Sequence, residues 1–141
     1  MNRVDFYILR ADDTESRWQF AGRLASKASR LGHRVLITVA SDNQARALDD
    51  FLWAHPEDSF LPHRCLNDQN APAATVEITS NDQCGDHNAV LINLCPTIPA
   101  AFERFERLAE IVIQTPEVLK NTREHFSFYK ARGYSVHHQS L

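Results

Sequence analysis

Short apolar runs and helix-spaced apolar positions alternate along the first third of the chain. Residues 4–9 form an apolar run rich in β-forming residues and bounded by charges, which predicts a buried strand. Apolar positions then recur at spacings of four, four and three, the pattern of one helical face: Phe20, Leu24, Ala28 and Leu31. A second run at 34–39 and a second helical face over 45–52 repeat the order. Strand–helix–strand–helix with short connections predicts right-handed βαβ units on a parallel sheet.

Helix start and stop signals support these boundaries. Asp12 to Thr14 offer side-chain oxygens and negative charge for the start of the first helix, and Gly32 is placed to end it. Ser41 and Gln44 have the spacing of a capping box before the second helix. Farther on, Thr115 followed by Pro116 predicts another helix start.

The rest of the chain has weaker patterns. Three prolines and many polar residues over 56–72 predict a loop. Further strands are predicted over 75–79, 90–94, 110–113 and 134–137, and further helices over 100–107 and 117–132. Residues 1–141 are therefore predicted to be one Rossmann-like α/β domain, with a mostly parallel sheet of about six strands flanked by about four helices.

Glycine is scarce for a fold of this class. The chain holds 4 glycines, and no two of them lie within four residues of each other. This excludes both common glycine-rich phosphate loops. The turns after the first two predicted strands, 10–13 and 40–42, carry carboxylates where the ligand of such a sheet normally binds. The sheet is typical of nucleotide-binding proteins, but these turns argue against a bound phosphate.

No motif for catalysis or metal binding is present in the sequence. The 7 histidines form no HExxH pattern, and the 3 cysteines at 65, 84 and 95 form no CxxC pair. We therefore predict no catalytic residue, no metal and no cofactor, and cysteines that stay reduced in the cytoplasm. A nucleotide-binding or small-molecule enzyme on the same sheet is the alternative; it needs a phosphate cradle or a convergent acid–base pair.

Charge is distributed unevenly although the net value is only -3. Lys and Arg outnumber Asp and Glu in residues 1–40 and 117–141, whereas acids dominate 41–116. A duplex-DNA binder usually has an extended basic face, and a single-strand binder has a basic groove with several stacking aromatics. A small basic patch suits an acidic peptide better, so we predict no direct nucleic-acid binding. No apolar run is long enough to cross a membrane.

The predicted helix 117–132 combines an apolar seam with cations. At about 100° per residue, one side holds the residues expected to face the core: Val118, Thr122, His125 and Tyr129. Lys120, Arg123 and Lys130 fall together on a neighbouring arc, with Leu119 and Phe126 at the border. This pattern indicates a binding surface, or long basic stems that cover the edge of the core.

Trp53 lies more than 100° from the apolar stripe of its predicted helix. An indole off the core face often marks a contact site, because tryptophan is enriched at binding hot spots. Local packing against the loop at Pro56 is the other interpretation.

Several segments together resemble one protein family. The run LDDFLWAHPEDSFLPH, residues 48–63, resembles the most recognisable stretch of the chi subunit of bacterial DNA polymerase III. Weaker matches follow the family order from end to end: Phe6-Tyr7, GHRVLI at 32–37, TVEI at 75–78, VLINL at 90–94 and YKARGY at 129–134.

The resemblance implies a non-enzymatic adaptor in the bacterial cytoplasm. Members pair with the psi subunit, which attaches them to the clamp-loader complex, and they bind the acidic, phenylalanine-terminated tail of the single-stranded DNA-binding protein. The psi-binding surface has an alternative association with a repair helicase. The resemblance implies no cofactor and no membrane contact.

The resemblance also assigns residues to these two surfaces. Positions that form the tail site in the family are Trp53, Val112, Arg123 and Phe126, and Lys120 and Lys130 would add weaker attraction for acidic residues. An arginine fork suits a terminal carboxylate. Phe60, Leu61 and Pro62 fall at the psi contact. Two positions depart from the family pattern: Leu119 replaces a frequent lysine, and Phe126 a frequent tyrosine.

Overall fold

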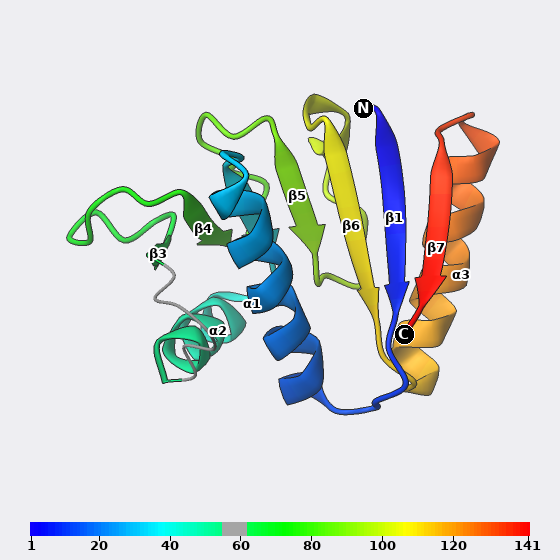
Figure 1. The fold of residues 1–141 in the computed structure, drawn as a ribbon, viewed down its shortest axis with the longest axis horizontal. Coiled ribbons are helices and arrows are strands. Elements are labelled where there is room, and N and C mark those ends of the chain that lie inside the picture. The colour runs from blue at the N-terminus through cyan, green and yellow to red at the C-terminus, as the bar shows by residue number, and fades with distance from the viewer. Residues whose placement is uncertain (55–61) are drawn as a thin grey trace.

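Four strands begin and end within one residue of those predicted at 4–9, 34–39, 75–79 and 90–94, whereas the strands predicted at 110–113 and 134–137 lie at 107–112 and 136–140. A computed structural model describes residues 1–54 and 62–141 of the chain (Figure 1). Its strands are β1 (Arg3–Ile8), β2 (Val35–Thr38), β3 (His63–Cys65), β4 (Val76–Thr79), β5 (Val90–Asn93), β6 (Arg107–Val112) and β7 (Val136–Ser140). Its helices are α1 (Thr14–Arg30), α2 (Asp42–Ala54), α3 (Pro116–Ala131) and the 3₁₀ turn η1 (Phe102–Arg104).

All described strands belong to one parallel sheet. Their order is β3-β4-β2-β5-β6-β1-β7, with β7 at one edge and β3 at the other. The α/β class and the parallel sheet are confirmed, with seven strands in place of about six. The additional strand, β3, lies inside the predicted loop 56–72, because three residues are too few to show a strand periodicity.

The helix predictions are confirmed at three of four positions. Among the described residues there are three α-helices, and the predicted helix 100–107 is wrong. Only η1 forms there, because Phe102 and Phe105 both turn inward and are buried, and β6 already begins at Arg107. In α1 the predicted Phe20, Leu24 and Ala28 pack against the core beside the fully buried Ala21 and Ala25. Leu31 is 69% exposed and is the one residue of the predicted face that does not.

The predicted helix caps are present. Asp13 Oδ2 accepts a hydrogen bond from the Ser16 N–H at 2.9 Å, and Ser41 Oγ accepts one from the Gln44 N–H at 3.2 Å. Thr115 Oγ1 accepts one from the Val118 N–H at 3.3 Å. Gly32 has a φ of 89°, the left-handed geometry that ends helices.

Two apolar clusters lie on opposite faces of the sheet. One packs α1 and α2 against the face that carries Ile37 and Ile111. The other packs α3 and η1 against the face that carries Phe6 and Leu108. Figure 1 shows α1 in front of the sheet and α3 behind it, so the two helices flank the carboxyl ends of the central strands. None of the described helices is long and apolar enough to cross a membrane.

Candidate functional site

Helix α3 turns its predicted core side onto the sheet. His125 is 5% exposed and Tyr129 is fully buried, as the periodicity predicted. Phe126 and Leu119 are half-buried at the border and pack on the cluster that contains Val112. The Phe126 ring lies 5.6 Å from the Phe6 ring of β1. The Phe126 side of α3 therefore faces β1 and the edge strand β7.

Three exposed cations continue this border, and we call Leu119, Lys120, Arg123, Phe126 and Lys130 the basic face. Lys130 Nζ lies 5.7 Å from the centroid of the Phe126 ring. Within the described part of the chain, Lys120 and Arg123 make no hydrogen bond and no ion pair. By contrast, Arg132 on the other side of α3 pairs with Glu103 at 3.5 Å. The basic face thus presents uncommitted positive charge beside apolar carbon.

Val112 belongs to the same region but not to its surface. Its side chain is 1% exposed, within the core cluster on which Leu119 and Phe126 pack. It therefore supports the basic face from below and lies out of reach of a ligand on the surface.

Trp53 is separated from the basic face. It lies near the end of α2, which packs on β3, β4 and α1, whereas α3 packs on β6 and β7 at the other end of the sheet (Figure 1). Trp53 is 43% exposed, and its ring lies 4.1 Å from that of His63 in β3. The exposed Pro62 directly precedes β3. Phe60 and Leu61 lie outside the described residues.

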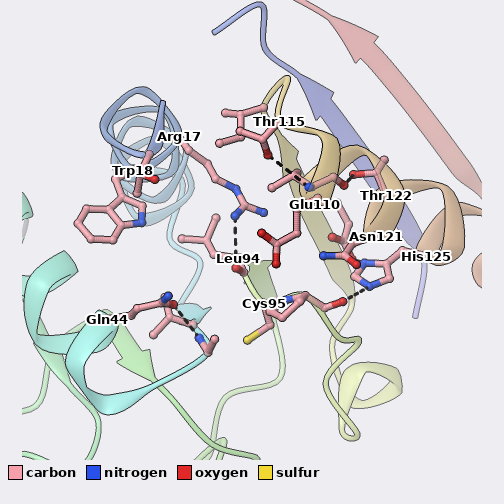
Figure 2. A pocket seen from close by; sticks show the side chains of 17 residues that line it. Arg17, Trp18, Gln44, Leu94, Cys95, Glu110, Thr115, Asn121, Thr122 and His125 are labelled. Carbon is pink, nitrogen blue, oxygen red and sulfur yellow. Dashed lines mark hydrogen bonds and ion pairs between the residues drawn. The ribbon is translucent and has the colours of Figure 1, made fainter. Parts of the chain in front are cut away.

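A crevice opens at the carboxyl ends of the central strands, between α1 and α3 (Figure 2). Its cavity measures about 440 Å³, within the range of small-molecule sites. Arg17 and Trp18 line it from α1, Cys95 from the end of β5, and Glu110 and His125 from the opposite side. This is where parallel sheets commonly bind ligands, so the chemistry of these side chains decides whether the enzymatic alternative has support.

Glu110 is the centre of a buried network in this crevice. Its Oε2 atom accepts hydrogen bonds from Asn93 Nδ2 at 3.0 Å and Tyr129 Oη at 2.9 Å. His125 Nδ1 lies 3.1 Å from the same oxygen, and His125 Nε2 lies 2.9 Å from the Pro96 carbonyl. Both ring nitrogens therefore face acceptors, and a protonated imidazolium satisfies both. Burial is the largest single influence and opposes this charge, but the hydrogen bond to Glu110, the negative charge of Glu110 and the Pro96 carbonyl together outweigh it and raise the pKa of His125.

Arg17 and Cys95, two further polar residues of the crevice, are held by the chain itself. Arg17 Nε donates to the Ile111 carbonyl at 2.8 Å, and burial lowers the pKa of Arg17. Burial also raises the pKa of the Cys95 thiol, which disfavours the nucleophilic thiolate. The side chains thus tie the ends of β5 and β6 to α1 and α3. This arrangement is structural and offers neither an activated nucleophile nor a phosphate cradle.

Sequence reasoning missed this network, although a signal was present. Asn93 and Glu110 interrupt apolar strands, and a buried polar residue requires partners. A second network is also built around a buried carboxylate on a strand. Glu77 of β4 is 1% exposed, and His87 Nε2 and Arg34 Nη2 lie 2.7 and 3.1 Å from its Oε1. Within residues 1–54 and 62–141 no group of three or more His, Cys, Asp or Glu side chains could hold a metal ion.

The His125–Glu110 pair predicts a pH dependence of stability. Because the folded chain holds the pKa of His125 above its ordinary value, the pair contributes fully below about pH 6.5, and the contribution is lost as pH rises through the folded pKa. The difference in unfolding free energy between wild type and His125→Gln should therefore shrink from about pH 6 to pH 9. Urea unfolding across this range measures it, and a difference that grows with pH would contradict the assignment.

Comparisons with known proteins show the family of this chain. The family model described as "DNA polymerase III chi subunit, HolC" matches residues 1–137. The DNA polymerase III subunit chi of Pseudomonas aeruginosa is 36% identical over 142 residues, which cover 100% of this chain and 98% of that protein. The subunit chi of Escherichia coli is 28% identical over 141 residues, with 96% of each chain covered. The chain therefore belongs to the DNA polymerase III chi subunit family, accessory subunits of the polymerase that replicates bacterial DNA.

Proposed function

We propose that this subunit is an adaptor whose basic face binds the acidic tail of the single-stranded DNA-binding protein. The observation that carries the proposal is the uncommitted Arg123 beside the half-buried Phe126 and Leu119. A tail that ends in phenylalanine brings an aromatic ring and a carboxylate to the same point. An apolar border can take the ring, and a guanidinium fork can take the carboxylate through two parallel hydrogen bonds. Lys120 and Lys130 add longer-range attraction for upstream acidic residues.

Psi pairing is proposed for the opposite end of the sheet. The exposed Pro62 and Trp53 lie at the β3 edge, and Pro62 directly follows Phe60 and Leu61 in the sequence. We assign Trp53 to this surface rather than to the tail site, because its ring stacks on His63 and α3 is far from it. Exposed aromatic and proline side chains suit a stable subunit interface. The repair helicase would compete with psi for this surface.

Separation of the two surfaces has a mechanical consequence. With the tail on α3 and psi at the β3 edge, the subunit can hold both partners at once. In this arrangement it would connect the clamp-loader complex to template coated by single-stranded DNA-binding protein, in the bacterial cytoplasm. The chain's own role in this proposal is to bind, and the crevice serves to hold the sheet and helices in register.

Titration with a short acidic peptide ending in Pro-Phe tests the tail proposal. We expect saturable one-to-one binding in calorimetry, weakened by added salt because the upstream contacts are exposed charges. A peptide of the same sequence with an amidated C-terminus is the matched control, and it should bind much more weakly because it lacks the carboxylate. Equal binding of the two peptides would contradict the role given to Arg123.

Phe60→Ala is expected to weaken pairing with psi by about 2 kcal/mol or more, the cost of truncating an aromatic anchor. The melting temperature of the isolated chain should stay nearly unchanged, and the tail peptide should bind as to wild type. Size-exclusion chromatography with psi and a melting curve measure both effects. A fall in melting temperature of several degrees with psi binding retained would instead make Phe60 a core residue.

A further inference from the structure

Strand β7 lies at an edge of the sheet, and among residues 1–54 and 62–141 no strand pairs with its outward row of backbone groups. In its parallel pairing with β1, the Val4 N–H donates to the Ser135 carbonyl at 2.9 Å, and the Leu141 N–H donates to the Ile8 carbonyl at 2.9 Å. Backbone groups alternate along a strand, so the odd-numbered residues from 135 to 141 face β1. The N–H and C=O groups of Val136, His138 and Ser140 therefore point outward from the sheet edge.

Strand β7 lacks the features that usually prevent an edge strand from pairing with another chain. Edge strands commonly carry proline, a bulge or inward-pointing charge that prevents pairing with another chain. β7 has none of these within Val136–Ser140, and its residues from 137 to 140 are exposed. Its side chains at 136, 138 and 140 share the face of Val136, which packs on the cluster under α3. The open edge thus lies next to the basic face.

The positive charges on α3 indicate which kind of segment would bind at this edge. Arg123 and Lys130 lie on the Phe126 side of α3, which faces β7, and Lys120 points to solvent beyond them, whereas Glu117 lies on the crevice side. An extended acidic segment that pairs with β7 would have its carboxylates next to these cations. A second copy of this chain would not, because its own β7 edge is polar and carries histidines rather than acids. Peptides recognised by strand addition gain affinity from main-chain hydrogen bonds and specificity from side-chain contacts beside the edge.

We propose that the acidic tail binds as an additional strand along β7, paired with the backbone of Val136, His138 and Ser140; this rests on the proposed function. α3 runs opposite to β7 (Figure 1), so Lys130 lies near the start of β7 and Arg123 farther toward its end. A tail with its carboxylate at Arg123 and its acids near Lys130 therefore runs parallel to β7. The two cations are seven residues apart, about 10 Å along the helix or about three residues of strand.

Pairing of this kind also has a defined register. If the N–H of the terminal phenylalanine donates to β7, the residue two positions before it does so as well, and the penultimate residue points away. A penultimate proline, which has no N–H, then loses no hydrogen bond. N-methylation two positions before the terminus should weaken binding, whereas N-methylation three positions before it should not.

Backbone amide exchange followed by NMR tests strand addition directly. Saturating the full chain with the Pro-Phe peptide should slow exchange at the amides of Val136, His138 and Ser140. The amides of His137 and Gln139, which already face β1, should change little. If the peptide binds but the three outward amides exchange as fast as before, the tail docks through side chains alone and strand addition is overturned.

His138→Pro removes one outward N–H at an edge position where proline is tolerated. We expect peptide binding roughly fivefold weaker than in the matched variant His138→Ala, which keeps the donor. Failure of the wild-type chain to bind the peptide would overturn the proposed function itself. Binding that depends on Arg123 but is equal in the two His138 variants overturns only the strand. If His138→Pro does not fold, the two N-methylated peptides on wild-type protein decide between the same outcomes.

Discussion

Replacing Glu110 with alanine should lower the free energy of unfolding by about 3–5 kcal/mol, the usual cost of removing one partner of a buried ion pair. Glu110 is 4% exposed, and one of its oxygens is the shared acceptor for Asn93, His125 and Tyr129. Without the carboxylate these buried donors lose their shared acceptor. Urea unfolding monitored by circular dichroism measures the loss.

Glu110→Gln is the matched control for this substitution. Glutamine has nearly the same size and keeps a carbonyl oxygen in place of Oε2, so the three donors retain an acceptor. We expect a smaller loss, about 1–2 kcal/mol, because only the charge of the acceptor is removed. The pKa of His125 should fall in this variant, which NMR titration of the ring detects. A loss below about 1 kcal/mol in Glu110→Ala would show that the network is not central to stability.

Arg123→Ala should weaken binding of the acidic Pro-Phe peptide by about 1.5–3 kcal/mol, the range for hydrogen bonds to a charged group. Arg123 is exposed and makes no hydrogen bond or ion pair with the described residues, so its removal should leave stability nearly unchanged. The effect therefore separates binding from folding. Calorimetric titration of the folded variant measures it, and unchanged affinity would overturn the assignment of the basic face.

Trp53→Ala provides the matched control for the tail experiment. Both side chains are exposed, but Trp53 lies beside β3 and Arg123 on α3, at opposite ends of the sheet. Peptide affinity should therefore be the same in Trp53→Ala and in wild type. A loss comparable to that of Arg123→Ala would return Trp53 to the tail site, as the family pattern alone implied.

The crevice and the basic face differ in how far the chain already engages their charged side chains. The crevice collects Arg17, Glu110 and His125, the residue types of many active sites, but hydrogen bonds within the chain engage all three. The basic face has simpler chemistry, and its cations Lys120 and Arg123 are not engaged by the described residues. A structural network therefore differs from a surface available to a partner because its side chains are already hydrogen-bonded within the chain, and not because of its residue types.

Much of the architecture could be predicted from local pattern. The strands at β1, β2 and β5 and the helices α1 to α3 each follow an apolar periodicity with a start or stop signal beside it. These signals are local, because a helix cap or a strand alternation involves residues a few positions apart. The failures were also local: β3 is too short to show a period, and the turn at Phe102 has the apolar content of a helix without its length.

The sequence alone determined the α/β class, the family, and the basic face of α3, since the residues that carry these properties are neighbours in the chain or on one helix. Only the tertiary structure decided that Glu110 meets His125, that Trp53 lies far from Arg123, and that β7 is an edge strand of the sheet that the described residues form. These relations depend on the strand order β3-β4-β2-β5-β6-β1-β7. That order is set by long-range crossovers and by the burial they achieve together, which no short stretch of sequence encodes.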